Sequence, residues 1–362
     1  MKPPKLTPIQ LDGSTGEGGG QILRTALALS VVTGRPFRID RIRAGRARPG
    51  LMRQHLACVR AAAEISRARV NGDTPGSTAL SFDPDSVRPG AFEFAVGTAG
   101  STMLVAQTIL PPLALAADAS TVRLRGGTHN PAAPPQDFIE HSFLPLLHGC
   151  GFRPTIALRR TGFFPAGGGE VELTVPPHTG GAPIDLRERG VLLSREIIVR
   201  LSGLPAHIGE RECASLRGQL DLPADAIRVE TEPQPAGPGN ALVALWRYER
   251  VTAVMVALGD PARSAARVAQ DLIGMIRRHV EHDAPVDDHL ADQLLLPCAL
   301  RHGGTFRAAG WTPHAETNAG VIRLFLPHVR INATRNGRLD WMVEVSPYNY
   351  HDIRTSQVRI SW

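Results

Sequence analysis

Three pairs of apolar helices are predicted along the chain, each pair preceded by a turn marked by glycine or aspartate and divided by a strand or loop. The pairs cover residues 21–33 and 51–66, then 101–117 and 134–148, then 288–301 and 317–326. Short runs with alternating apolar residues, such as 121–125 and 170–175, predict half-buried strands between the helices. Because a recurring plan is typical of repeated supersecondary units, the sequence predicts an α+β fold built from three repeated α/β units.

The third unit is interrupted. Its strand-rich part lies near residues 151–176, whereas its helices start only at 288. The stretch between carries strands of its own (196–201, 241–248 and 252–258), helices of its own (208–220 and 262–282) and Pro/Gly-rich joints at 176–183 and 233–239. We therefore expect a large domain of residues 1–185 and 284–362, with a small α+β domain of residues 186–283 inserted in the third unit. The tail after Pro327 is predicted to add strands, including 341–345 and 358–362.

The charge balance favours an anionic partner, because the net charge is +6. Lys2 and Lys5 are the only lysines, so the rest of the chain offers no lysine nucleophile and no Walker-type phosphate loop. The four cysteines are far apart and form no CxxC pair, which argues against a disulfide framework or a cysteine zinc site and favours a cytoplasmic location. No apolar run is long enough to span a membrane, so we expect no membrane partner. The sequence makes no prediction of the oligomeric state.

A glycine-rich run marks the start of the first helix. Residues 11–24, LDGSTGEGGGQILR, hold five glycines within eight residues. Such a run exposes backbone N–H groups at a helix N-terminus, where anions bind. Glu17 among the glycines suits a Mg²⁺ or Mn²⁺ ligand beside a phosphate, although the helix dipole also explains an acidic residue near a helix start. Arg24 follows one helical turn after the glycines and is placed to face the same anion.

An arginine cluster follows in residues 43–55, RAGRARPGLMRQH. Guanidinium groups bind phosphate in a bidentate manner, so Arg43 and Arg46 suit a nucleotide or an RNA phosphate. A solvated basic face is the simpler interpretation for an isolated run of arginines. Gln54 and His55 follow at once at a helix start, which favours a site.

Two later motifs each have a structural and a functional interpretation. Gln107 interrupts an apolar stretch, so it must be hydrogen-bonded to either the protein or a ligand. In 289–293 (HLADQ) and 313–318 (PHAETN), Asp292 and Gln293 suit a helix-capping role, and His314 suits either a structural role or a catalytic one.

Taken in order, the motifs closely resemble the RNA 3'-terminal phosphate cyclase family. They read DGxxGEGGGQILR, RAGRxxPGLxxQH, GxAGSxxLVxQTxLP, GGTxNPxAPPxDF, FxPAGGGE, HLADQLxLP and HxxTN, and the likeness extends from Leu11 to Pro327. The resemblance implies three units similar to the C-terminal domain of a bacterial translation initiation factor, with a smaller domain inserted in the third.

The resemblance also implies a role for each matching residue. His314 is the residue that becomes adenylylated, and Glu17 is the metal-associated carboxylate. The positions implied to bind ATP are Gln107, His289, Leu290, Ala291, Asp292 and Gln293, with Pro134 and Phe138 beside the adenine. The positions implied to surround the phosphates are Gln21, Arg24, Arg43, Arg46, Gln54 and His55.

The implied reaction converts an RNA 3'-phosphate end to a 2',3'-cyclic phosphate, with ATP and Mg²⁺ or Mn²⁺, through a histidine–AMP intermediate and an RNA(3')pp(5')A intermediate. Such a step belongs to RNA processing. Three alternatives remain. A non-catalytic relative that works in ribosomal RNA processing lacks the histidine that His314 supplies here. An enolpyruvyl transferase has distantly similar repeats but does not require GEGGGQ or HxxTN, and a pure RNA-binding module is supported only by the basic charge.

Overall fold

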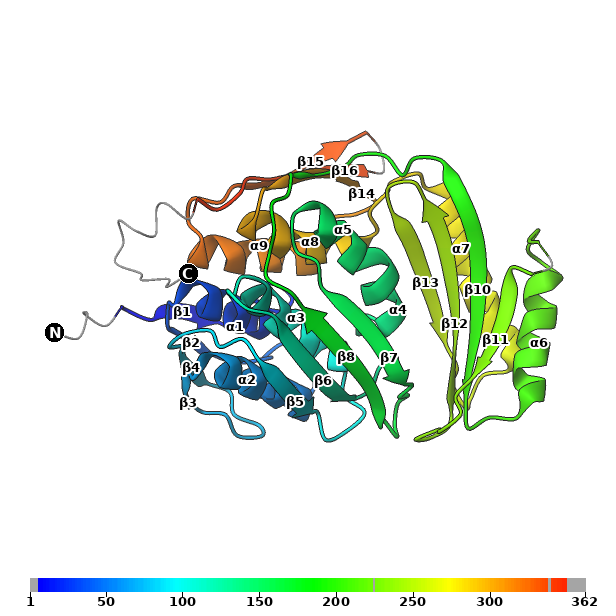
Figure 1. Cartoon of the computed structure of the whole chain (residues 1–362), viewed down its shortest axis with the longest axis horizontal. Coiled ribbons are helices and arrows are strands. Elements are labelled where there is room, and N and C mark those ends of the chain that lie inside the picture. The colour runs from blue at the N-terminus through cyan, green and yellow to red at the C-terminus, as the bar shows by residue number, and fades with distance from the viewer. Residues whose placement is uncertain (1–5, 224, 338–339, 350–362) are drawn as a thin grey trace.

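The computed structural model describes residues 6–223, 225–337 and 340–349. Within these residues the strands form four sheets of four strands each, and helices lie between and beside them (Figure 1). The coarse prediction of a mixed α+β fold is confirmed. The bounds of the elements follow sheet by sheet.

The first sheet has the order β1-β2-β4-β3 and the second has the order β5-β6-β8-β7. The strands of the first are β1 (Ile9–Asp12), β2 (Phe37–Asp40), β3 (Arg69–Asn71) and β4 (Leu80–Asp83), with helices α1 (Gln21–Thr33) and α2 (Arg53–Ser66). Those of the second are β5 (Ala91–Ala95), β6 (Ser120–Gly126), β7 (Thr155–Arg160) and β8 (Gly169–Val175). Its helices are α3 (Thr102–Ala114), α4 (Gln136–Phe138), the π-helical η1 (Ile139–Phe143) and α5 (Leu144–Gly149).

The third sheet has the order β15-β16-β14-β9 and the fourth has the order β11-β10-β12-β13. The third combines β9 (Ile184–Leu186), β14 (Gly304–Ala308), β15 (Ile331–Asn336) and β16 (Asp340–Val345) with helices α8 (Asp288–Leu300) and α9 (Pro313–Phe325). The fourth combines β10 (Leu192–Ser202), β11 (Ile227–Thr231), β12 (Gly239–Tyr248) and β13 (Thr252–Leu258) with helices α6 (Ala206–Arg217) and α7 (Ala265–Glu281).

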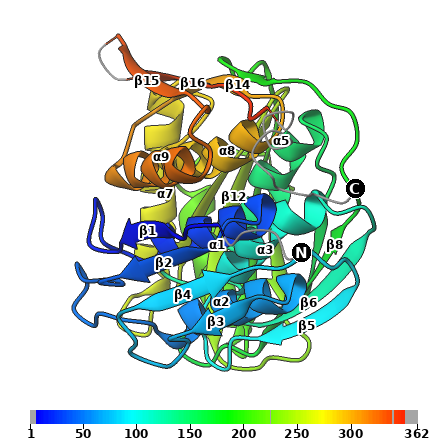
Figure 2. The same cartoon turned by 90° about the vertical axis from the view of Figure 1, so that its left-hand side faces the viewer.

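The first three sheets share one strand arrangement. In each, the first strand along the chain pairs in parallel with the second, the fourth pairs antiparallel with the second, and the third pairs antiparallel with the fourth. The fourth sheet differs, because its first strand β10 lies between β11 and β12. In Figure 2 the first three sheets surround helices α1, α3, α8 and α9, which lie between them.

Local sequence explains where the helices begin and end, with two corrections. Helix α1 ends as predicted at Thr33, and its C-cap Gly34 has a φ of 67°, which suits glycine. Helix α9 begins at Pro313 rather than at 317, because the Thr312 side chain accepts a hydrogen bond from Ala315 N and a proline at the first helical position needs no donor. The capping role considered for Asp292 and Gln293 is wrong, since the N-cap of α8 is Asp287.

The predicted strand 341–345 is confirmed as β16, whereas 358–362 lies outside the described residues. The described helices include none that is both long and apolar enough to cross a membrane.

Candidate active site at the glycine turn

Five helices bring together the predicted site residues. Helix α1 contacts α2, α3 and α9, and α8 contacts α9. Residues from the glycine-rich run before α1 therefore face residues from α8 and α9, almost three hundred positions later. We call the group Glu17, Arg24, His55, Asp292 and His314 the glycine-turn site.

The glycine turn has no room for side chains. Gly16 and Gly18 adopt φ angles of 58° and 61°, which favour glycine. A Cβ at Gly19 would meet the Glu17 carboxylate and the Arg46 guanidinium, and a Cβ at Gly20 would meet the His55 ring and Arg24. The glycines thus allow the backbone to approach the charged groups closely, which suits the binding of an anion.

Glu17 is a buried carboxylate with unused hydrogen-bonding capacity. Its side chain is 11% exposed, pairs with the Arg46 guanidinium and lies with Oε1 3.5 Å from His314 Nε2. Neither carboxylate oxygen accepts a hydrogen bond from a described residue. The helix-dipole explanation does not apply, because the first turn of α1 contains no acidic residue and Glu17 precedes its N-cap Gly20.

Arg24 is a half-buried cation beside the same turn. Its Nη2 donates to Gln21 Oε1 at 2.8 Å, but it forms no ion pair with any described carboxylate. Burial lowers the pKa of Arg24, and the nearby Cys58 and Asp292 only partly offset this effect. A half-buried guanidinium that has no carboxylate partner among the described residues is suited to an incoming anion.

His55 is held neutral in a defined tautomer. Burial, reinforced by the charges of Arg24 and Arg43, lowers the pKa of His55 to about 3. Its Nδ1 accepts a hydrogen bond from Met52 N at 3.2 Å. Since a backbone N–H can only donate, the ring proton resides on Nε2, the atom that faces Gly20. His55 therefore presents a neutral N–H donor to the glycine turn.

Asp292 lies in the second turn of α8 and connects three helices. Gln21 Nε2 is 3.5 Å from its Oδ1, and Asn318 Nδ2 donates to its backbone oxygen at 2.9 Å. Thr25 in turn donates to Asn318 Oδ1 at 2.8 Å. Burial raises the pKa of Asp292, against the opposing effect of Asn318 and the nearby cations.

His314 is the most accessible member of the site. Its side chain is 50% exposed and lies in the first turn of α9. Desolvation lowers the pKa of His314; the charges of Arg46 and Arg24 act in the same direction, and Asp292 opposes them. The positive end of the helix dipole also disfavours protonation. An accessible, neutral imidazole is what a nitrogen nucleophile requires.

Comparison with known proteins identifies the family. The family model for RNA 3'-terminal phosphate cyclase matches residues 15–331. The chain belongs to the RNA 3'-terminal phosphate cyclase family. It is 48% identical over 325 residues to an RNA 3'-terminal phosphate cyclase of Koribacter versatilis, covering 90% of this chain and 92% of the relative. It is 49% identical over 334 residues to one of Ralstonia nicotianae, covering 91% and 94%, and 47% identical over 333 residues to one of Salmonella enteritidis, covering 91% and 97%.

Several residues assigned by likeness to the cyclases hold the site together. Gln107 Nε2 donates to Gln293 Oε1, so these two amides connect α3 to α8. Gln54 Oε1 accepts from Ser101 N at 3.4 Å and joins the start of α2 to the start of α3. Arg43 donates to the backbone oxygens of Arg48 and Gly50 at 2.6 and 2.9 Å, which orders the arginine loop.

Other residues assigned by likeness to the cyclases are not members of the glycine-turn site, although His289 is near enough for its charge to affect Asp292 and His314. Leu290 and Ala291 are 1% and 0% exposed, so only their backbone is available to a ligand. Phe138 is 5% exposed within the main core, and Pro134 is partly exposed in the loop before α4. His289 is exposed in the first turn of α8, where its N–H donates to Asp287. Their roles beside the adenine stay predictions.

Thr25, Thr317 and Asn318 are site residues that sequence reasoning did not select. Thr317 Oγ1 accepts from Glu17 N at 3.2 Å and donates to Pro313 O at 2.6 Å. The threonine and asparagine of PHAETN gave a signal for the last two, because both are polar at buried positions of a helix. Thr25, inside an apolar helix, gave none.

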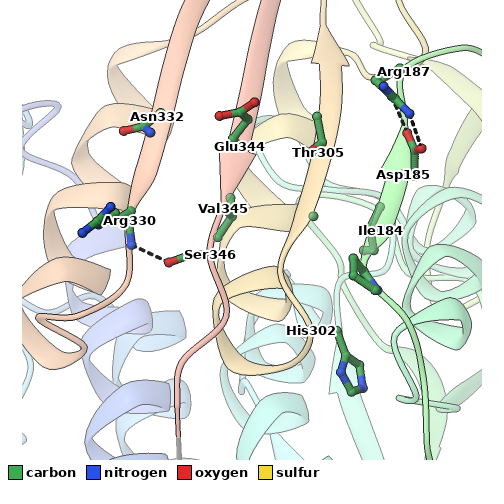
Figure 3. Close-up of a pocket in the computed structure, with 12 residues that line it drawn as sticks. Ile184, Asp185, Arg187, His302, Thr305, Arg330, Asn332, Glu344, Val345 and Ser346 are labelled. Carbon is green, nitrogen blue, oxygen red and sulfur yellow. Dashed lines mark hydrogen bonds and ion pairs between the residues drawn. The ribbon is translucent and has the colours of Figure 1, made fainter.

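One surface pocket lies away from the glycine-turn site. A cavity of about 520 Å³ opens on the third sheet, where it is lined by Asp185, Arg187, His302, Glu344 and their neighbours (Figure 3). In this pocket Arg187 is already paired with Asp185, and none of its lining residues belongs to the glycine-turn site.

Proposed function

We propose that this chain is an ATP-dependent enzyme that converts an RNA 3'-phosphate end to a 2',3'-cyclic phosphate, with His314 as the adenylylated nucleophile. The family and the close relatives support cyclase chemistry. The single observation that carries the nucleophile assignment is the position of His314: half-exposed, neutral and beside the glycine turn, with Nε2 3.5 Å from Glu17.

The proposed reaction has three steps. First, a ring nitrogen of His314 forms a bond to the α-phosphorus of ATP, and pyrophosphate leaves. Second, an oxygen of the RNA 3'-phosphate attacks that phosphorus, so the phosphorus–nitrogen bond breaks and an RNA(3')pp(5')A end forms. Third, the adjacent 2'-hydroxyl loses its proton and attacks the activated 3'-phosphate, which closes the cyclic ester and expels AMP. The last step is intramolecular, so positioning supplies much of its rate.

The residues around His314 have assigned parts in this scheme. Arg24 and the Nε2–H of His55 donate to phosphate oxygens at the glycine turn, and Arg46, now paired with Glu17, exchanges that partner for a phosphate. Gln21 and Asp292 hold Arg24 in place, while Gln107 and Gln293 border the nucleotide. Arg43 and Gln54 act on the RNA phosphate through the loops that they order.

Glu17 fits a divalent cation. Its two buried carboxylate oxygens accept no hydrogen bond from the described residues, and hard cations such as Mg²⁺ and Mn²⁺ prefer carboxylate oxygens. A bound cation would neutralise charge on the phosphoryl oxygens. Glu17 would hold such a cation close to His314, since its Oε1 lies 3.5 Å from His314 Nε2.

We also infer that the first three sheets with their helices are three repeats, and that residues 186–283 form a domain inserted in the third. The shared strand arrangement of the first three sheets supports the repeats. The fourth sheet has its own core with α6 and α7, which supports the insertion. The boundaries at 185/186 and 283/284, and a cytoplasmic location, stay predictions.

The experiment that tests this proposal is incubation of the protein with α-labelled ATP and a divalent metal, followed by gel analysis. We expect label on the wild type that is acid-labile and base-stable, as a phosphorus–nitrogen bond requires, and none on His314→Ala. His328→Ala is the matched control, because His328 is an exposed histidine just beyond the other end of α9.

The other outcomes identify the alternatives. Label on neither protein under any metal condition, together with RNA binding that His314→Ala leaves intact, indicates a non-catalytic relative or an RNA-binding module. Equal label on the wild type and on His314→Ala assigns the nucleophile to another residue. Conversion of a 3'-phosphorylated RNA to a phosphatase-resistant end by the wild type alone completes the assignment of the substrate.

A further inference from the structure

The fourth sheet is buried on both faces. One face, which includes Ile197, Val199 and Leu242, packs against α6 and α7. The opposite face, which includes Ile198 and Val243, joins the main core of the molecule. There β13 contacts α4 and η1. Figure 1 shows β13 beside α4. The fourth sheet therefore packs directly on the segment that contains Phe138.

Arg200 is one of several charged residues on this face, where it lies next to the apolar residues that join the main core. Strand alternation places it on the same side as Ile198, and its side chain is only 13% exposed. Its Nε and Nη2 donate to Asp137 Oδ1 at 3.2 and 2.8 Å. It also pairs with Glu230, its neighbour on β11. The guanidinium thus connects two strands of the fourth sheet to α4.

Asp137 continues the network into the loop after β6. Its Oδ2 lies 2.7 Å from His129 Nε2, and His129 Nδ1 lies 2.8 Å from Thr128 Oγ1. Asp137, His129 and Thr128 are all 0% exposed. Burial alone raises the pKa of Asp137, but the hydrogen bond and charge of His129 and those of Arg200 outweigh it and hold the pKa well below its usual range. We call Thr128, His129, Asp137, Arg200 and Glu230 the Asp137 junction.

The Asp137 junction is better suited to fixing geometry than to adding stability. A buried ion pair gains little over a well-packed apolar pair of the same volume, because both charges lose their hydration. Its hydrogen bonds are directional, however, so they define one position for the group that they hold. Asp137 is held from both sides, and it directly precedes Phe138 in a helix of only three residues.

We propose that Arg200 is a positioning residue for nucleotide selection. Through Asp137 it holds residues 134–138 as one wall of the adenine pocket, so that the fourth sheet controls recognition of the base without touching the nucleotide. This inference rests on the proposed function, in which Pro134 and Phe138 flank the adenine. It assigns to the fourth sheet a part in the first chemical step.

The test measures the rate of self-adenylylation against nucleotide concentration in Arg200→Met and Arg200→Lys. We expect Arg200→Met to raise the half-saturating ATP concentration on the order of tenfold, with a maximal rate close to wild type, because a displaced wall weakens binding while His314 keeps its place. The preference for ATP over CTP should fall by a similar factor. Arg200→Lys should restore part of both.

Arg247→Met is the matched control. Arg247 pairs with Glu196 at 2.7 Å on the same face of the fourth sheet, but away from Asp137. It should leave the half-saturating concentration and the base preference unchanged. If Arg200→Met is poorly soluble, Arg200→Met with Asp137→Leu, which removes both charges, should fold and still show the loss of base preference.

The outcomes separate the two proposals. A lower amplitude of labelling with unchanged half-saturation and unchanged base preference means that Arg200 only supports folding, and it overturns the positioning role. An equal change in Arg247→Met overturns it as well. If no nucleotide labels the wild type, that result contradicts the proposed function rather than the positioning role.

Discussion

The glycine-turn site and the Asp137 junction both bury charged side chains, yet they satisfy them to very different degrees. In the junction, Asp137 accepts hydrogen bonds from Arg200 at one oxygen and contacts His129 at the other. In the site, Arg24 has no carboxylate partner among the described residues, and Glu17 is paired with the partly exposed Arg46 but accepts no further hydrogen bond from them. Unsatisfied buried charge costs stability, so the difference marks which group awaits a ligand and which is complete.

The largest effect is expected from a substitution that breaks the Asp137 junction. Asp137→Asn removes the charge that faces Arg200 and leaves it buried with Glu230 as its only partner. We expect the free energy of unfolding, measured in urea, to fall by roughly 3 kcal/mol, as for other buried pairs that lose one member. The exposed pair of Arg69 with Asp83 serves as the control, and Arg69→Ala should cost less than about 1 kcal/mol.

The junction should also respond to acid. Because the pKa of Asp137 is lower in the folded chain than in the unfolded one, its contribution is complete above the unfolded value of 3.8 and is lost as the pH falls below it. Wild type should therefore lose stability in that acid range more steeply than Asp137→Asn. Equal losses of stability in the two proteins would show that the charge of Asp137 does not cause the loss.

The second prediction concerns the glycine-turn site, where we expect a loss of activity without a loss of stability. Arg24→Met replaces a half-buried cation, which has no carboxylate partner among the described residues, by an apolar chain of similar length. We expect the rate of self-adenylylation to fall by about 10²–10³-fold, the usual consequence of deleting one donor to a developing oxyanion. Urea unfolding of the same preparation should show equal or greater stability, because the cost of burying the charge disappears. A loss of stability as large as that of Asp137→Asn would mean that Arg24 is structural.

The same contrast explains what the sequence could predict. The bounds of α1 follow from a continuous apolar face and a terminal glycine, both local signals. The glycines around Glu17 predicted a tight turn for the same reason, and Gly16 and Gly18 adopt the left-handed conformation that only glycine tolerates well.

The predicted start of α9 was wrong because Thr312 and Pro313 define the N-terminus of this helix. Thr317 lies inside the helix, where its hydroxyl donates a hydrogen bond to Pro313 O. Asp292 looked like a cap for a similar reason, since an acidic residue near a helix start has that local explanation. Only the packing of α9 against both α8 and α1 places it instead beside Gln21 and Asn318.

The Asp137 junction could not be predicted from local pattern at all. Arg200 and Asp137 are 63 positions apart, and a single arginine in a strand ordinarily faces solvent. The residues of the glycine-turn site could be predicted in part, because their motifs resemble a known family. The geometry that joins those motifs, such as the bond of Gln107 to Gln293, came only from the fold.

The smallest effect sharpens the comparison, because one unsatisfied carboxylate lies in neither region. Glu212 on α6 is 0% exposed; its Oε1 accepts from Asn240 at 2.5 Å, and its Oε2 has no described partner. Burial raises the pKa of Glu212 from 4.5 to about 7, against the opposing effects of Asn240 and Arg211.

The folded chain therefore holds a proton on Glu212 that the unfolded chain releases between pH 4.5 and pH 7. Because of this difference, the free energy of unfolding declines as the pH rises through that range. Glu212→Gln removes the ionisation, and it should be more stable than wild type at pH 8 by about 3 kcal/mol while showing no advantage below pH 4.5. Urea unfolding at the two pH values measures this difference, and the rate of self-adenylylation should stay at the wild-type level in the same variant. A variant that gains stability but loses activity would assign Glu212 to the reaction, and an unsatisfied buried charge would then mark function in the fourth sheet as it does at the glycine turn.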